Sequence, residues 1–160
     1  MIRSLDSKDT IIVNFDGLCE PKNPGGIATY GFVIYKSGRK IHQEYGIAYA
    51  RPWSDEASNN VAEYSAVIHA LEWLRAHDYL ESSIILRGDS RLVVNQISGI
   101  FKVKAVRIVE LYERTMNLLA QFSKMKVEWV ERSLNKEADL LSRIAYSKFV
   151  KSKKSTNRSS

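Results

Sequence analysis

The chain has 160 residues, of which 44% are apolar and 26% are charged, as is ordinary for a soluble globular protein. This length makes one domain the default and is enough to bury a sizeable core. The single cysteine excludes an intramolecular disulfide framework. No apolar run reaches the roughly 20 residues that span a bilayer. The N-terminal sequence MIRSLDSKDT does not resemble a signal peptide, so we expect a cytoplasmic protein without a membrane partner.

The net charge of +6 comes mostly from the C-terminus. Residues 147–160, SKFVKSKKSTNRSS, contain five of the 24 basic residues and no acid, which leaves 19 basic and 18 acidic residues elsewhere. Because such a segment buries little apolar surface, we expect residues 148–160 to form a disordered basic tail. Two interpretations of this tail stay open: non-specific attraction to phosphate backbones, and a role in solubility alone.

The predicted elements follow a polar leader, residues 1–9, and lie within one domain, residues 10–147. Apolar and β-branched runs predict strands, and apolar residues at helical spacing predict helices. The predicted strands cover residues 10–15, 27–36, 39–50, 82–88 and 126–131, and the helices cover residues 60–76, 90–97, 105–122 and a segment that begins near Asn135. The order β-β-β-α-β-α-α-β-α predicts an α/β fold, a five-stranded mixed sheet with helices packed on both faces.

Glu63 is an acidic residue on what should be a buried face. At helical spacing it shares a stripe with Val67, Ala70, Leu71 and Leu74, which we expect to face the core. A lone carboxylate there costs several kcal/mol unless another group compensates it.

Three further acids also border apolar sequence at the ends of predicted elements. Asp16 ends the first strand, Asp89 ends the fourth, and Asp139 lies in the first turns of the last helix. Ligands bind beyond the carboxyl ends of parallel strands, near the point where the strand order switches. We therefore expect these acids and Glu63 to gather at one edge of the sheet.

Four carboxylates in one place repel each other strongly. Two divalent cations would remove this problem, since Mg²⁺ prefers oxygen ligands and paired metals assist phosphoryl displacement. Each acid also has a simpler interpretation. Asn60 and Glu63 fit a capping box, Asp139 fits a favourable helix-dipole contact, and Asp16-Gly17 and Asp89-Ser90 fit turns. The metal hypothesis depends on the four acids as a set.

Four motifs together resemble the ribonuclease H type 1 family, in its short archaeal and bacterial branch. They are DGLCEPKNPGG, NNVAEYSA, GDSRLVVNQISG and NKEADLLSR, and the similarity covers residues 10–147. The resemblance implies a metal-dependent endonuclease that cuts the RNA strand of an RNA–DNA hybrid with Mg²⁺ or Mn²⁺, leaving 5′-phosphate and 3′-hydroxyl ends. It also implies that Asp16, Glu63, Asp89 and Asp139 are the catalytic, metal-binding acids.

The resemblance assigns further residues to substrate binding. Asn59 and Asn60 match residues that contact the minor groove, where side-chain amides can meet 2′-hydroxyl groups. Cys19 and Asn23 lie in a loop that approaches the RNA strand in the family. Asn135 also matches a family position. Helix capping is an alternative for the asparagines that precede the two helices.

The chain departs from the family pattern at three places. The loop ERSLNKEAD lacks the histidine that many members carry, and Arg132 could hold a phosphate there or be a solvated loop charge. The basic handle between the middle helices is missing, which leaves Lys102 and Lys104 as candidate substrate contacts. Arg91 replaces an amide two residues after the third acid.

Three hypotheses follow for the function. The first is an active ribonuclease H, most simply a monomer. The second is a non-catalytic nucleic-acid-binding module, which the presence of all four acids disfavours. The third is a nuclease that also cuts double-stranded RNA, which is likewise A-form.

Overall fold

The structure is a computed structural model that describes residues 9–159, with side chains described as far as residue 154. The predicted leader lies outside the described residues except for Asp9. Five strands form one sheet in the order β3-β2-β1-β4-β5. The strands are β1 (Ile11–Glu20), β2 (Ile27–Lys36), β3 (Arg39–Ile47), β4 (Ser83–Gly88) and β5 (Lys124–Trp129).

The sheet is mixed, as the sequence predicts. β1 pairs antiparallel with β2, and β2 pairs antiparallel with β3. β4 pairs parallel with both β1 and β5. The first strand is longer than predicted, because β1 stays paired with β2 as far as Glu20. The pairing with β4 ends earlier, at Phe15 opposite Gly88. Asp16 therefore lies within a strand, one residue beyond the point where β1 and β4 separate.

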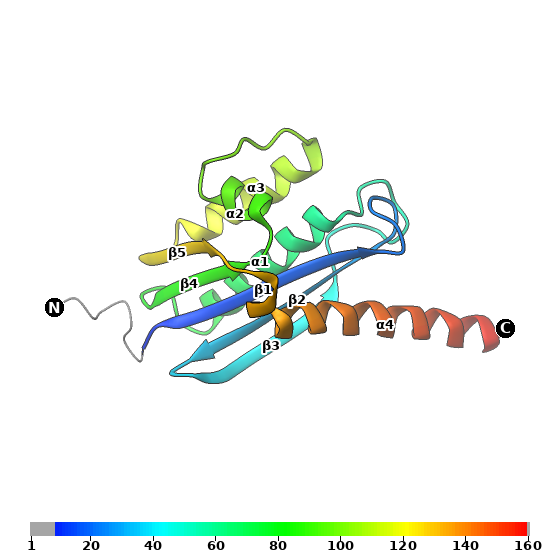
Figure 1. Cartoon of the computed structure of the whole chain (residues 1–160), viewed down its shortest axis with the longest axis horizontal. Coiled ribbons are helices and arrows are strands. Elements are labelled where there is room, and N and C mark those ends of the chain that lie inside the picture. Colours follow the sequence, from blue (N-terminus) through cyan, green and yellow to red (C-terminus); the bar gives the residue numbers. More distant parts are fainter. Residues whose placement is uncertain (1–8, 160) are drawn as a thin grey trace.

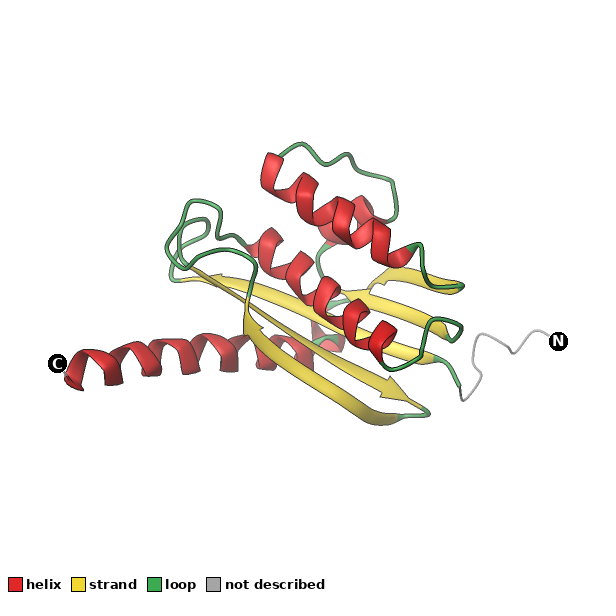
Figure 2. Ribbon diagram, turned by 180° about the vertical axis from the view of Figure 1, so that it is seen from behind, coloured by secondary structure: helices red, strands yellow, loops and turns green. Residues whose placement is uncertain are grey.

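Helices cover both faces of the sheet, which confirms the predicted layering. The helices are α1 (Asn59–Ala76), α2 (Arg91–Ile97), α3 (Val106–Leu119) and α4 (Lys136–Ser159). α1 packs on β1 and β2 with α3 beside it, whereas α4 packs on β1, β2 and β3 from the other side (Figure 2). The core between α1 and the sheet contains large, fully buried side chains such as Phe15, Phe32, Tyr64 and Leu71.

The sheet lies very close to α1 and α4, and glycines make this possible. A Cβ atom at Gly17 would lie 2.5 Å from the backbone of Ala62 and Glu63 on α1. A Cβ atom at Gly31 would lie 2.7 Å from the Ala138 carbonyl oxygen on α4. These contacts fix the first turns of both helices against β1 and β2.

The C-terminal segment differs from the predicted disordered tail. In place of a tail from residue 148, α4 continues as helix through Ser159 and extends past the end of the sheet (Figure 1). The docked first half of α4 supplies the helical nucleus, and adding residues to an existing helix is far easier than starting one. Among the described residues, no helix has the length and apolar character needed to cross a membrane.

We expect Gly31→Ala to lower the free energy of unfolding by about 1–3 kcal/mol, because the added methyl group meets backbone atoms of α4 that cannot move alone. Gly46→Ala is the matched control, since its methyl group would meet the Tyr30 ring at 3.1 Å, and a side chain can give way. Urea unfolding of both variants measures the difference. An equal loss in the free energy of unfolding for Gly31→Ala and Gly46→Ala would contradict the tight docking of α4.

Candidate active site

Three of the four predicted acids lie together where β1 and β4 separate. Asp16, Glu63 and Asp89 each place a carboxylate oxygen within 4.8 Å of the others. Asp16 comes from β1, Glu63 from the first turns of α1, and Asp89 directly follows β4. We call these three residues the acid cluster. The sequence-based expectation that distant acids gather at one edge of the sheet is met for this trio.

The position of Glu63 does not come from helix capping. Ser58 is the N-cap of α1, and its side chain accepts a hydrogen bond from the Val61 amide. The first turn of α1 contains no acid, so the capping-box interpretation of Asn60 and Glu63 is wrong. Glu63 is buried, and its Oε2 atom has no hydrogen-bond partner among the described residues. The close approach of Gly17 to α1 places this carboxylate beside Asp16.

Asp89 is held by contacts from the β5 side. The Trp129 indole N–H donates to the Asp89 carbonyl oxygen at 3.1 Å. The Arg132 guanidinium lies 3.7 Å from the Asp89 carboxylate, while 85% of the Arg132 side chain is exposed. Ser90, rather than Asp89, caps α2 by accepting a hydrogen bond from the Val93 amide. The Asp89 side chain is therefore left to face the acid cluster.

Asn135 joins the start of α4 to the acid cluster. It is completely buried, and its Nδ2 donates to the Phe15 carbonyl oxygen at 2.8 Å. A hydrogen bond from Asn135 also lowers the pKa of Asp89, against the larger effect of burial. With no exposed surface, Asn135 positions β1 and Asp89 in place of the substrate contact that the sequence suggests.

Asp139 lies at the flank of the acid cluster and is not among the three acids that meet. Its carboxylate accepts a hydrogen bond from Arg143 Nε at 3.2 Å, and 30% of its side chain is exposed. Its charge nevertheless raises the pKa of Asp16 and of Asp89. Asp139 also lies in the first turn of α4, where the helix dipole favours an acid.

Burial and mutual repulsion disfavour ionisation of the acid cluster. Burial, followed by the charge of Asp89, raises the pKa of Asp16 from 3.8 to about 7. Burial, followed by the charge of Asp16, raises the pKa of Glu63 well above its ordinary value. Burial also raises the pKa of Asp89, although Arg132 opposes this change. A cation among these oxygens would favour the charged forms of all three acids.

The acid cluster suits a hard divalent cation. All its donors are carboxylate oxygens, the ligands that Mg²⁺ and Mn²⁺ prefer. The Glu63 Oε2 atom is a buried acceptor without a protein donor, and a cation would satisfy it. The donor set and this orphaned oxygen both fit the metal that the sequence implies.

The predicted substrate contacts fall into two groups. Asn23 and Asn59 are exposed, and the Asn23 side chain accepts a hydrogen bond from the Asn59 amide at 3.0 Å. Asn60 is half-buried beside them, and Lys102 and Lys104 are exposed in the connection between α2 and α3. Cys19 is buried instead, and its thiol donates to the carbonyl oxygens of Lys22 and Ala57, so it stabilises the loop from within.

Sequence reasoning missed Trp129 and Arg143, which shape this site. The Arg91 guanidinium stacks 3.7 Å from the centre of the Trp129 ring, so Trp129 orients both Arg91 and the Asp89 backbone. Nothing in the sequence pairs Trp129 with Asp89 or with Arg91 of α2. Arg143 follows Asp139 by four residues, and this helical spacing is a signal that could have revealed the pair.

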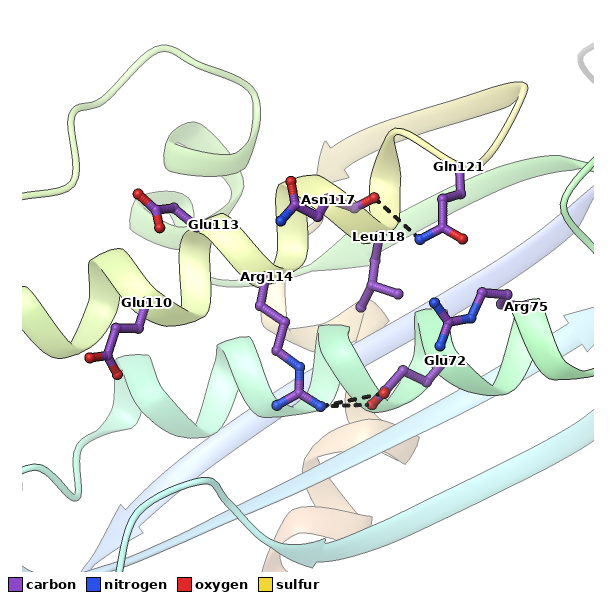
Figure 3. A pocket seen from close by; sticks show the side chains of 8 residues that line it. All are labelled: Glu72, Arg75, Glu110, Glu113, Arg114, Asn117, Leu118 and Gln121. Carbon is purple, nitrogen blue, oxygen red and sulfur yellow. Dashed lines mark hydrogen bonds and ion pairs between the residues drawn. The ribbon is translucent and has the colours of Figure 1, made fainter.

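Two histidines and a hollow between α1 and α3 lie apart from the acid cluster. His69 on α1 stacks on Tyr30, and His77, the C-cap residue of α1, stacks on Trp73. A hollow of about 480 Å³ between α1 and α3 contains none of the predicted site residues (Figure 3). Its ion pair between Glu72 and Arg114 spans the two helices.

Comparison with known proteins gives consistent relationships. A model of the reverse transcriptase-like family matches residues 14–145. Ribonuclease HI of Halobacterium salinarum is 36% identical over 127 residues, which are 79% of this chain and 59% of that protein. A bifunctional protein of Mycobacterium tuberculosis is 35% identical over 119 residues, 74% of this chain. The chain spans only 31% of the length of that mycobacterial relative.

Solved structures agree with the sequence relatives. The N-terminal RNase H domain of the mycobacterial protein superposes with a TM-score of 0.78 at 29% identity, over 90% of this chain and 98% of that chain. LC11-RNase H1, solved in complex with an RNA/DNA hybrid, superposes with a TM-score of 0.76 at 28% identity, over 88% of this chain and 99% of that chain. The fold, the acid cluster and these relatives define a reverse transcriptase-like domain, and within that class the chain belongs to the ribonuclease H type 1 family.

The raised pKa of Asp16 predicts how stability depends on pH without metal. A carboxyl that ionises near pH 7 when folded, but at its ordinary pKa of 3.8 when unfolded, makes the folded state lose stability as pH rises between these values. We expect the chelated protein to be about 1–4 kcal/mol less stable at about pH 8 than at about pH 4 from this effect. Urea unfolding of the wild type and of Asp16→Asn measures it.

The asparagine variant should show a flatter pH dependence, with the part due to the raised pKa values of Glu63 and Asp89 remaining, and Asp55→Asn, a change at an exposed acid, should follow the wild type. Added Mg²⁺ should restore stability to the wild type at the higher pH. Identical pH profiles for the wild type and Asp16→Asn would show that Asp16 ionises normally in the folded protein.

Proposed function

We propose that this chain is a ribonuclease H that cuts the RNA strand of RNA–DNA hybrids internally, using two metal ions and leaving 5′-phosphate and 3′-hydroxyl ends. The observation that carries the proposal is the convergence of Asp16, Glu63 and Asp89 at the point where β1 and β4 separate. A purely structural role for the three acids is only partly compensated: Arg132 faces Asp89, but Glu63 Oε2 has no hydrogen-bond partner among the described residues. The complex of LC11-RNase H1 with a hybrid supports the choice of substrate.

The acid cluster supplies the ligands, with Asp139 added from the flank. Bound divalent ions would stabilise the attacking and leaving oxygens of an in-line phosphoryl displacement. Asp16 and Glu63 hold fixed positions because the backbones of β1 and α1 are in contact at Gly17. Asp89 is fixed through its carbonyl oxygen by Trp129. These constraints hold the oxygens in place before substrate arrives, which is the condition for electrostatic catalysis.

Arg132 and the asparagines of α1 have complementary tasks around the acid cluster. Arg132 reaches Asp89 with a largely exposed guanidinium, so it can also contact a substrate phosphate, but it stays protonated and cannot act as a base. Asn59 and Asn60 present side-chain amides next to Asn23 at the start of α1. Amides there can recognise the 2′-hydroxyl groups that distinguish an RNA strand from DNA.

We expect Asp89→Asn to abolish cleavage of a labelled RNA–DNA hybrid in Mg²⁺ while the fold stays intact, because the amide loses the charge that a cation needs. Asp55→Asn should retain wild-type activity. The assay compares hybrid, double-stranded RNA and single-stranded RNA in Mg²⁺, in Mn²⁺ and in excess chelator. Hybrid cleavage that persists in chelator, or at the wild-type rate in Asp89→Asn, would contradict the metal mechanism. Cleavage of double-stranded RNA would show a broader substrate range.

We expect Arg132→Ala to slow turnover by about tenfold, the effect of losing one charged hydrogen bond to a phosphate, without weakening the affinity for metal. Arg39→Ala, at an exposed position on β3, is the control for removing one positive charge. Initial rates with hybrid and a Mg²⁺ titration separate the two effects. An unchanged rate would make Arg132 a solvated loop charge.

A further inference from the structure

The second half of α4 is a helix of one charge sign. After Asp139 the sequence contains six basic residues and no acid. Figure 1 shows this helix continuing outward past the end of the sheet. A solubilising segment needs no fixed direction, whereas a helix holds its side chains on defined faces.

One face of this helix leads away from the acid cluster. Starting from Asp139, residues 4, 8, 12 and 15 positions later fall on the same side of an α-helix. They are Arg143, Ser147, Lys151 and Lys154, and we call them the α4 stripe. All four are exposed. At 1.5 Å per residue, the stripe extends roughly 22 Å from Asp139, comparable with about six steps of 3.4 Å along one nucleic-acid strand.

The stripe begins in a groove next to the acid cluster. Arg143 and Ser147, together with Tyr146, form one wall of a hollow of about 420 Å³. Leu18 and Glu20 of β1, two and four residues beyond Asp16, complete its lining. Side chains two residues apart on a strand lie on the same face, so this groove continues the surface on which Asp16 lies.

The cations of α4 differ in their contacts. Lys148 donates to the Tyr45 hydroxyl, and Lys153 lies 5.4 Å from the centre of the Phe149 ring. Lys151 and Lys154, in contrast, have no ion pair or ring contact with any side chain that the structure describes. Lys151 and Lys154 of the stripe therefore present free positive charge, whereas Arg143 is paired with Asp139, and Lys148 and Lys153 contact groups of the protein.

We propose that the α4 stripe binds the phosphate backbone of the nucleic acid that lies in the acid cluster, and so acts as the chain's anchor for substrate beyond the cleavage point. This inference rests on the proposed function for its ligand. Outside the C-terminal segment the chain carries almost equal numbers of acids and bases, so the rest of the domain attracts a polyanion weakly. The stripe places the excess positive charge along the path that a nucleic-acid strand would follow from the groove between β1 and α4.

A matched pair of double variants tests the proposal in the full chain. K151A/K154A removes the two free charges of the stripe, and K148A/K153A removes two charges of the same segment that contact groups of the protein. Alanine favours helix at least as well as lysine, so both variants should keep α4, as far-UV circular dichroism can check. The binding of a fluorescent RNA–DNA hybrid of about 20 base pairs is measured in chelator at several salt concentrations.

We expect K151A/K154A to weaken binding by about tenfold or more at low salt and to reduce the slope of log affinity against log salt by about 2, one counterion per lost contact. K148A/K153A should change the slope by less than half as much. K151R/K154R should restore wild-type affinity. Equal losses in both alanine variants, or no loss in K151A/K154A, would overturn the proposal.

Two further arms separate this inference from other outcomes. Vesicles with anionic lipid replace the hybrid in one arm, and a loss confined to vesicle binding in K151A/K154A would overturn the proposal in favour of a membrane surface. Cleavage by the wild type is followed in the other. A wild type that binds hybrid through the stripe without cutting it would refute the proposed nuclease function and leave the stripe supported.

Discussion

Repulsion among three buried carboxylates is the constraint on which this molecule depends. The carboxylates cannot move apart, because the backbone of β1 touches the backbone of α1 at Gly17 and so keeps Asp16 and Glu63 together. Their ionisation is also disfavoured, since burial raises the pKa of each one and the charges of neighbouring acids add to the rise. Buried carboxylates held together at one point favour the binding of a cation, and a bound cation attracts phosphate.

The elements around the acid cluster act as a frame that holds it in place. Trp129 of β5 fixes the Asp89 carbonyl oxygen and carries Arg91 on its ring. Asn135, buried at the start of α4, ties this helix to β1 through the Phe15 carbonyl oxygen. Parallel pairing of β4 with both β1 and β5 brings these contacts to one edge of the sheet. Asp16 lies on a strand, Glu63 on a helix, and Asp89 directly after a strand, so the site is built on or next to regular elements rather than on a long loop.

α4 links the acid cluster to the outer surface of the molecule. Its first turn holds Asp139 at the flank, where Arg143 is its partner. The same arginine begins the α4 stripe, so one residue adjoins both the acids and the basic surface. This arrangement places negative and positive groups in sequence along one helix, as a site that binds a metal and a polyanion requires. It also gives the C-terminal charge a defined direction, which a disordered tail lacks.

The sequence by itself determined the element order, the mixed sheet and the identity of the acids. Local patterns are sufficient for these, since strand and helix periodicity, turn residues and isolated acids in apolar stripes are visible along the chain. It also indicated the family, because four motifs in a fixed order are more specific than any one of them. The exact end of the first strand was not visible, since Asp16-Gly17 has the composition of a turn and only pairing with β2 continues the strand.

Only the tertiary structure decided which acids meet and what surrounds them. Asp139 lies outside the trio, at the flank, where it pairs with Arg143. Asn135 and Cys19 are buried, which a polar loop sequence does not predict. The helical state of residues 148–159 depends on the docked part of α4, which supplies the nucleus that this segment lacks alone. The burial of Asn135 and Cys19 depends on contacts with residues far away in the sequence, which local patterns along the chain do not show.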